Sequence, residues 1–470
     1  MTPPHRALTL APRSPQEVFG VEASTLYVEV LLSLLLTLPA PRHPLAYYGC
    51  LLLDLSKLVL TFAPALEAAL HVLFARLPAL DVSLATRLAE WAALHISHFG
   101  FNLAPFAETW GAAARAADTD AADVGAAVQS DFVRHVLSRL VRISYLERVE
   151  RDCPPLLVPL LPPKPVGHVA WEAPAAGDTE PSSDVALSGA LLAKLRNKIP
   201  LDEVCEWIDS AIAPDARPQL VMHTLLDAGS RSPSHLDKLL EKFGRVLAHV
   251  GGAEQANKAA IVAAALDYWR DAAGMRSLVT ARLLRHRLVD AAAVLACAFG
   301  GRGADALGRA DGWESIEAMV LSASSVQRAA AGALAEQERE LAKETEGEMD
   351  GDDDDQLPSA ALSAQGERVA RLRDDLDELR REKKSLFANL CVGACGALSA
   401  RWREIRAAGG DPTADKWVRA VVGQTQAIAR KSLADFSLET VMMVVDGSEG
   451  VEAEAQAAVF DGLKLVAAHC

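Results

Sequence analysis

Apolar residues recur along most of this chain at three- and four-residue steps, the spacing that places side chains on one face of an α-helix. Phe132, Val136, Leu137, Leu140 and Val141 are an example. Short polar or proline-containing breaks separate the segments, which favours antiparallel helical hairpins. The first block of helices is expected at 27–38, 47–62, 64–77, 83–98, 106–117 and 131–149.

A proline-rich stretch interrupts this pattern. Six prolines lie between residues 154 and 165, and polar sequence continues to residue 184. Proline breaks helices and stiffens extended chain. We therefore expect an irregular segment at 1–23, a helical domain at 24–152, a linker at 153–184 and a second helical domain at 185–470. Helices of the second domain are predicted at 187–197, 201–212, 217–227, 233–250, 254–273, 275–284, 290–299, 386–407, 414–433, 438–445 and 453–469.

The region 326–387 has a different, charge-rich character. Val369, Leu372, Leu376 and Leu379 alternate three- and four-residue steps, and Leu386 resumes the phase with Lys383 in the intervening position. Ala330, Leu334 and Leu341 repeat the phase more weakly upstream. These two arms predict an antiparallel coiled-coil hairpin with an acidic tip at 345–357, whose distal part, 338–366, we expect to be dispensable for the fold.

The composition supports an all-α class with a sizeable core. Hydrophobic residues make up 50% of the chain, charged residues 23% and aromatic residues only 5%, and the abundant alanine and leucine favour helix over strand. A formal net charge of -15 argues against direct binding of a phosphate backbone, which requires basic groups. If RNA is involved, we expect another subunit to touch it.

The cysteines and the apolar runs indicate in which compartment the protein is expected to reside. Seven cysteines are scattered without the spacing of a zinc finger or a redox pair, and they are interpreted as reduced core thiols of an intracellular protein. The most apolar run, 30–38, is too short to span a bilayer. No membrane segment and no secretion signal are expected.

The sequence contains no motif that predicts catalytic, cofactor-binding or metal-binding residues. His95 and His98 are three positions apart but lack further ligands at metal-site spacing, so a structural pair is favoured. Cys391 and Cys395, one helical turn apart, are interpreted as packing. The glycines at 300, 301 and 303 lack the flanking residues of a phosphate-binding loop. The chain is therefore predicted not to be an enzyme.

Two groups of large or charged side chains remain. Trp91, Trp110, Trp269 and Trp313 lie on apolar faces and are expected in the core. A second group, Arg282, Arg285 and Arg287, forms a dense basic cluster. A solvated helix end is the favoured interpretation, and the alternative is a surface that binds an acidic partner.

Several stretches resemble the large subunit of the nuclear mRNA cap-binding complex. These are Tyr47-Tyr48-Gly49 with LLLDLSKL at 51–58, HISHFGFNLAPFAETW at 95–110, FVRHVLSRLVRISYLERV at 132–149, LDYWR at 266–270, LLRHRLVDAAAVLACAF at 283–299, Trp313-Glu314 at the start of the long helix, and KSLF at 384–387. The resemblance runs in order from about residue 26 to the final helix.

The resemblance implies domains similar to the middle domain of a large translation initiation factor, called MIF4G-like, each a stack of ARM/HEAT-like helical hairpins. The chain looks like the second and third of three such domains, with the first one missing. It further implies a scaffold that stabilises a small subunit with an RNA-recognition motif. In that family the small subunit holds the m7G cap of RNA polymerase II transcripts, so the large subunit meets capped RNA indirectly.

Splicing, export and decay factors are the further partners that the resemblance implies, with the nucleus as the main location and the cytoplasm as a second one. Two alternatives remain open from the residues. A helical-repeat translation-initiation or RNA-processing scaffold would bind a helicase instead of an RNA-recognition subunit. A helical enzyme would need a convergent polar pocket that the sequence does not reveal.

Overall fold

We describe a computed structural model of the chain over residues 22–120, 123–171, 183–229, 232–350, 359–431, 438–448 and 450–467. Within these residues all regular structure is helical and no strand occurs, which confirms the all-α class. The chain divides into two compact units, Met1–Pro162 and Pro163–Cys470. Each unit is described by itself.

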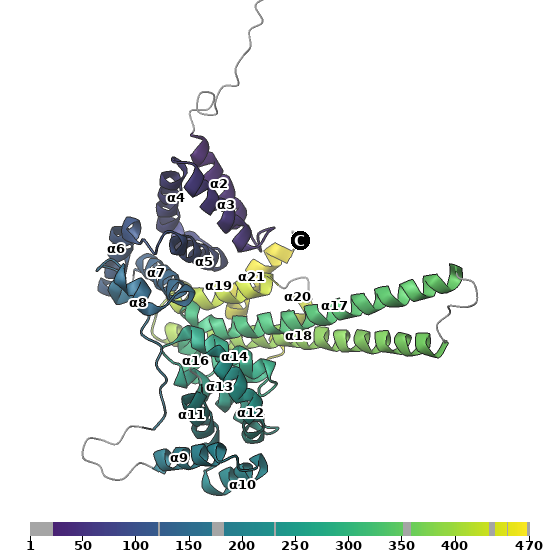
Figure 1. Ribbon diagram of the computed structural model, residues 1–470. Helices are drawn as coiled ribbons and strands as arrows, with labels where there is room; N and C mark the ends of the chain where they lie inside the picture. Colours follow the sequence, from purple (N-terminus) through teal and green to yellow (C-terminus); the bar gives the residue numbers. More distant parts are fainter. Residues whose placement is uncertain are drawn as a thin grey trace, which may run out of the picture. The chain divides into compact units, whose positions relative to one another are not determined.

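Unit 1 is a set of helices connected by short turns (Figure 1). Helix α2 packs on α4, and α7 packs on both α5 and α6, as expected for stacked hairpins. Its helices are α2 Ala23–Leu35, α3 Leu45–Leu58, α4 Phe62–Arg76, α5 Val82–His98, α6 Ala107–Thr119, α7 Val124–Ile143 and α8 Leu146–Arg151, with short 3-10 turns η1 Leu77–Ala79, η2 Ala104–Phe106 and η3 Val158–Leu160.

The ends of α7 differ from the sequence prediction. The helix begins at Val124 rather than at residue 131, because the Asp123 side chain caps it by accepting a hydrogen bond of 2.9 Å from the backbone of Ala126. It stops at Ile143, and the chain turns at Ser144 before α8 begins. The predicted single helix at 131–149 is thus two helices.

A buried cation holds the turn after α2. Arg87 donates hydrogen bonds to the carbonyl oxygens of Leu35, Thr37 and Pro39 at 3.1, 2.7 and 3.1 Å. Because helix C-termini leave carbonyls without intrahelical partners, the guanidinium connects α5 to the end of α2. Burial lowers the pKa of Arg87 despite the nearby carboxylates of Glu90 and Asp81.

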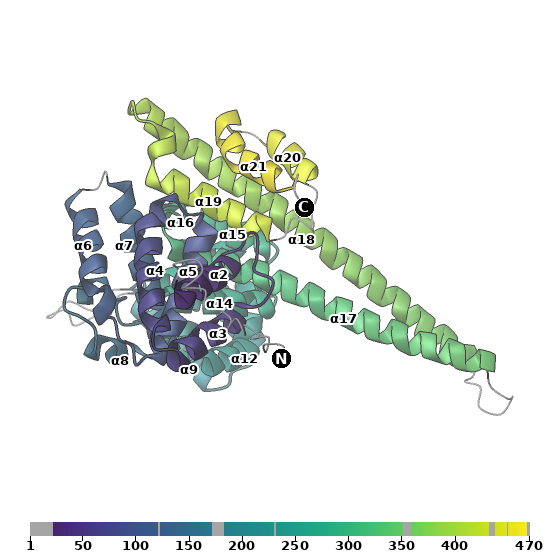
Figure 2. The ribbon, with the colours of Figure 1, turned by 90° about the horizontal axis from the view of Figure 1, so that it is seen from above.

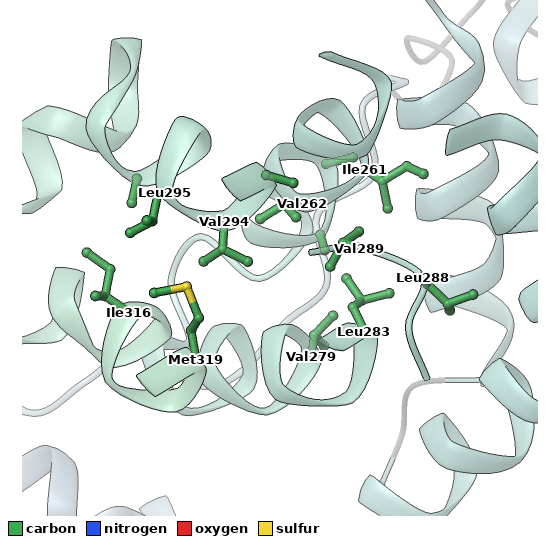
Figure 3. Close-up of a cluster of buried hydrophobic side chains, with 14 of the residues drawn as sticks. Ile261, Val262, Val279, Leu283, Leu288, Val289, Val294, Leu295, Ile316 and Met319 are labelled. Atoms are coloured by element: carbon green, nitrogen blue, oxygen red, sulfur yellow. The ribbon is translucent and has the colours of Figure 1, made fainter. Parts of the chain in front are cut away.

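Unit 2 is the larger helical stack, and two long helices extend from it. Figure 3 shows part of its core, where side chains from four helices converge. The helices are α9 Ser183–Arg196, α10 Leu201–Ala211, α11 Arg217–Gly229, α12 Pro233–Gly251, α13 Gln255–Tyr268, α14 Ala273–Arg285, α15 Ala291–Phe299, α16 Gly301–Ala306, α17 Glu314–Asp350, α18 Ser359–Ala407, α19 Lys416–Arg430, α20 Leu438–Asp446 and α21 Ala453–Ala467, with 3-10 turns η4 Ala310–Trp313 and η5 Pro412–Ala414.

Helices α17 and α18 form the predicted coiled-coil hairpin, which projects from the rest of unit 2 (Figures 1 and 2). Leu334, Val369 and Leu376 form a small apolar cluster of their own, separate from the main core of the unit. Arg373 Nη2 lies 2.7 Å from Glu338 Oε1 and links the two arms. Part of the predicted acidic tip, 351–357, lies outside the described residues.

The base of the hairpin differs from the prediction. A new helix was expected from residue 386, but α18 continues without a break to Ala407. No proline or glycine lies between residues 367 and 392, so nothing interrupts the backbone hydrogen bonding there. The buried residues of the hairpin seam and the core residues Phe387 and Leu390 therefore belong to one rigid helix.

The proline-rich segment packs at both of its described ends. Leu157 and Leu160 are buried in the core of unit 1. In unit 2, the backbone amides of His168 and Ala170 donate to Tyr268 O at 2.8 Å and to His223 Nδ1 at 2.9 Å. Residues 167–171 thus form a strap across unit 2.

Candidate protein-binding surfaces

The three arginines of the basic cluster lie at the end of α14. Arg282 and Arg285 belong to its last turn, and Arg287 follows with a φ of 55° in the left-handed region. Arg282 Nε lies 3.0 Å from Asp237 Oδ1, and His286 Nε2 lies 3.7 Å from the same oxygen. Arg282 therefore ties α14 to α12, whereas Arg285 and Arg287 are exposed.

Helix α12 adds cations that sequence reasoning missed. Lys238 and Lys242 are exposed on this helix, next to the Asp237 that holds Arg282. They lie 40 or more residues from the arginines in the sequence, so no local pattern joins them. Further along α12, Arg245 pairs instead with Asp202 of α10 at 2.8 Å.

An exposed apolar surface on unit 1 was also missed. Helix α2 buries Val28, Leu32 and Leu35, yet Leu26, Tyr27, Val30 and Leu34 on its other side are between 47% and 60% exposed. The Ser24 and Thr61 hydroxyls are 2.5 Å apart, which places the start of α2 beside the turn after α3. In that turn Leu60 is 96% exposed. Clustered apolar exposure of this kind is typical of contact surfaces.

The histidine pair expected to be structural lies in an aromatic environment. The ring of His95 lies 5.1 Å from that of Trp91 and 4.9 Å from that of Phe99. His98 Nδ1 contacts Leu94 O at 2.7 Å instead of sharing a ligand with His95. A cavity of about 30 Å³ beside His95, lined mainly by Phe74, Trp110 and other apolar side chains, has room for about one water molecule.

Burial disfavours the reactive thiolate form of two cysteines of α18. It raises the pKa of Cys391 and of Cys395 to about 12, with the neighbouring Cys395 adding to the effect on Cys391. Both side chains are fully buried, so the packing interpretation is confirmed. Cys50, by contrast, is exposed, and the expectation of core thiols was wrong for it. Among the described residues no group of three or more metal-ligating side chains occurs.

The other sequence candidates fit their structural interpretations. Trp91, Trp110, Trp269 and Trp313 are all buried, which confirms that they are core residues. The glycine cluster ends α15 and opens the short α16. A Cβ on Gly303 would lie 2.1 Å from Cys297 O, so this glycine is required by a close backbone approach.

In the described part of the chain no helix is both long enough and apolar enough to cross a bilayer. What the described residues do show is stacked helical hairpins, a projecting hairpin, and exposed apolar and basic surfaces. These features define a helical-repeat protein that offers surfaces to other molecules.

Comparison with known proteins identifies the family. A family model described as MIF4G like matches residues 179–435, and another with the same description matches residues 8–155. The first match covers more than half of the chain. The chain belongs to the MIF4G-like family.

Relatives extend this assignment. The chain is similar to nuclear cap-binding protein subunit 1 of rice, with 29% identity over 281 residues, 58% of this chain and 31% of that protein. The Arabidopsis thaliana protein of the same name shows 29% identity over 60% of this chain and 32% of its own length. The chicken protein shows 25% identity over 77% of this chain and 45% of its own length.

The matched part of the chain thus spans less than half of the length of these relatives. These matches confirm the resemblance to the large subunit of the nuclear cap-binding complex that the sequence motifs predicted. The names of the relatives and the helical-repeat architecture fit a protein that is not an enzyme.

Proposed function

We propose that the chain is a non-enzymatic scaffold subunit of a nuclear cap-binding complex. It binds and stabilises a small subunit with an RNA-recognition motif, and that subunit holds the m7G cap of RNA polymerase II transcripts. The observation that carries the proposal is the pair of MIF4G-like matches together with relatives named nuclear cap-binding protein subunit 1.

The physical properties of the chain support this division of labour. A net charge of -15 disfavours independent binding of RNA, because nucleic-acid affinity depends on cations that displace counterions. A rigid helical stack can instead order a partner. Ordering a segment before it meets the cap removes the entropic cost of folding on binding, and cap affinity rises without direct contact.

The test is co-expression with the cognate small subunit. We expect a stable heterodimer on a sizing column at micromolar concentration, and retention of both chains on an immobilised m7G cap analogue. The chain alone should pass through the cap resin. Separation of the two chains on the column would exclude the proposed role.

A rival function is a helical-repeat scaffold in translation initiation or RNA processing, since the MIF4G-like description fits it equally well. Such a scaffold should bind an RNA helicase and ignore the small RNA-recognition subunit. Parallel pull-downs with the two candidate partners separate the functions. We further propose that the complex works in the nucleus, also reaches the cytoplasm, and recruits splicing, export and decay factors.

A further inference from the structure

The strap lies directly on helices α11 and α13 of unit 2. The amide of His168 donates to Tyr268 O at 2.8 Å, and the amide of Ala170 donates to His223 Nδ1 at 2.9 Å. Tyr268 is the last residue of α13, where a helix has no further amides of its own to offer to its carbonyls. A Cβ on Gly167 would lie 2.2 Å from the Tyr268 hydroxyl oxygen, so the strap approaches α13 as closely as only glycine allows.

His223 of α11 connects the strap to the interior of the unit. Its side chain is fully buried, and its Nε2 lies 2.9 Å from the carbonyl oxygen of Ala264 on α13. A carbonyl oxygen can only accept, so Nε2 carries a hydrogen, whereas Nδ1 accepts from Ala170 and carries none. Both ring nitrogens are thus in use, and only the neutral ring with its hydrogen on Nε2 satisfies both partners.

Protonation of His223 would reverse one of these two hydrogen bonds. A charged imidazole carries a hydrogen on each nitrogen, and the hydrogen on Nδ1 would then face the amide hydrogen of Ala170. Two opposed donors repel each other, and a buried charge without an acceptor is costly. Moving Ala170 away from the ring relieves the conflict and lets water reach Nδ1.

Charged groups near His223 come from the end of α13 and from α11. Burial lowers the pKa of His223 most, the hydrogen bond to Ala264 O and the charge of Asp267 raise it, and Arg270 lowers it further, with a net result below the ordinary histidine value. On α11 itself, Asp227 Oδ1 lies 3.4 Å from the hydroxyl of Tyr268. The closed strap therefore favours the neutral ring at neutral pH.

The other helices that pack on α11 meet it through uncharged groups. Helix α9 contacts it where the Thr224 hydroxyl donates to the Ser188 hydroxyl at 2.9 Å. Helix α12 contacts it where Leu239 lies against Gly229. These contacts supply no charge that would stabilise a protonated His223.

We propose that His223 is a proton-operated latch, and that acid releases the strap from unit 2. Ala170 is exposed, and Val169 and Trp171 are only partly buried against the core, so release removes little apolar packing. Leu160 is buried in unit 1, which leaves residues 161–166 between that core and the closed strap. Release lengthens this connection and widens the reach of the two units.

The experiment measures hydrogen exchange of the strap amides in the full chain by mass spectrometry, corrected for the intrinsic pH dependence of exchange. Protection should be constant near neutral pH. Below the ordinary histidine pKa of about 6.5 it should fall by up to about tenfold per pH unit, because the open strap takes up a proton that the closed strap resists. Peptides around Leu390 in the core of α18 should keep their protection over the same range.

His223→Gln tests the titrating group. The glutamine amide can accept from Ala170 and donate to Ala264 O, but it does not titrate in this range. Protection of the strap in this variant should not depend on pH. The inference goes beyond the proposed function, because it requires no small subunit.

His168→Gln is the matched control, because His168 is the titratable side chain of the strap itself. Its Nδ1 accepts from Arg270 Nη2 at 3.1 Å, and its Nε2 lies 2.8 Å from Asp271 Oδ2. A proton on His168 strengthens the attraction to Asp271, so it does not favour release. This variant should keep the acid response of the parent.

Ala170→Pro tests the latch without changing the core. Proline has no amide hydrogen, and Ala170 is exposed, so His223 and its contact with Ala264 are retained. Protection of the strap should already be about three- to tenfold lower at neutral pH, as expected for the loss of one hydrogen bond. Acid should change it little further.

Any of five results would overturn the latch. These are constant protection of the parent strap across the range, an acid response that persists in His223→Gln, its loss in His168→Gln, parental protection in Ala170→Pro, or a parallel loss of protection in the core of α18. The heterodimer assay is separate. Failure there removes the proposed function and leaves the exchange measurement on the free chain decisive for the latch.

Discussion

His95 lies between the rings of Trp91 and Phe99, and its Nδ1 is buried without a hydrogen-bond partner among the described residues. Burial, with a smaller contribution from the charge of His98, lowers the pKa of His95 to about 4. The unfolded chain has the ordinary histidine pKa of about 6.5. In acid, the unfolded state therefore takes up a proton that the folded state resists.

This difference predicts a pH dependence of stability. The stability that neutral His95 contributes is fully present above pH about 6.5. It is lost as the pH falls toward about 4, and at that pH the loss of unfolding free energy reaches roughly 3 kcal/mol. His95→Phe keeps the aromatic packing and removes the titration. Urea unfolding of unit 1 between pH 4 and pH 7 should show a flatter profile for this variant than for the parent.

His98→Asn serves as the control for that experiment, because His98 is exposed. Its pH profile should stay close to that of the parent. Parallel profiles for His95→Phe and the parent would show that His95 does not make the assigned contribution.

At the scale of elements, the hairpin of α17 and α18 has its own small apolar cluster of Leu334, Val369 and Leu376. That cluster is separate from the main core of unit 2, in which Phe387 and Leu390 of the same α18 are fully buried. Distal opening of the hairpin therefore exposes little of the surface that stabilises the unit.

Replacing residues 338–366 by a short Gly/Ser link should leave the main thermal transition unchanged, because no residue of the main core is removed. Leu372→Asp with Leu376→Asp should melt the hairpin alone, since charge is placed in its seam. Circular dichroism should show lost helical signal in both variants. Loss of the cooperative transition in the deletion variant would mean that the arm belongs to the domain core.

At the scale of the whole molecule, each unit has its own apolar core. The boundary lies at residues 162 and 163, and the residues just before it pack into unit 1. Leu157 is fully buried there and Leu160 is 4% exposed. Burying a leucine side chain contributes about 1.5–3 kcal/mol, so these residues act as part of the fold.

Two fragments test this boundary. A fragment of residues 1–162 should unfold in one cooperative transition, whereas a fragment of residues 1–152 should melt at a lower temperature because it lacks both leucines. Leu157→Ala in the longer fragment should reproduce much of the loss, at about 2–5 kcal/mol. Equal melting temperatures of the two fragments would show that the segment after residue 152 is not needed.

Much of the fold followed from local pattern. The helical spacing of apolar residues predicted most helices, because burying one face of a helix is a property of neighbouring residues. The seam at Val369 and Leu376 predicted the hairpin for the same reason. The start of α7 was missed because a capping side chain, and not the hydrophobic period, determines where that helix begins. The unbroken α18 was missed because the hydrophobic pattern changes at residue 386 although no helix breaker lies there.

Which charged and apolar side chains are exposed was decided by the tertiary structure. The sequence contained Arg282, Arg285 and Arg287 as one group, yet only packing against Asp237 separates the paired Arg282 from the two exposed arginines. In the same way, α2 is apolar on more than one side, and its neighbours alone determine that Leu32 is buried while Leu34 is exposed. Local composition determines which residues can be buried, but solvent exposure and charge pairing depend on residues far away in the sequence.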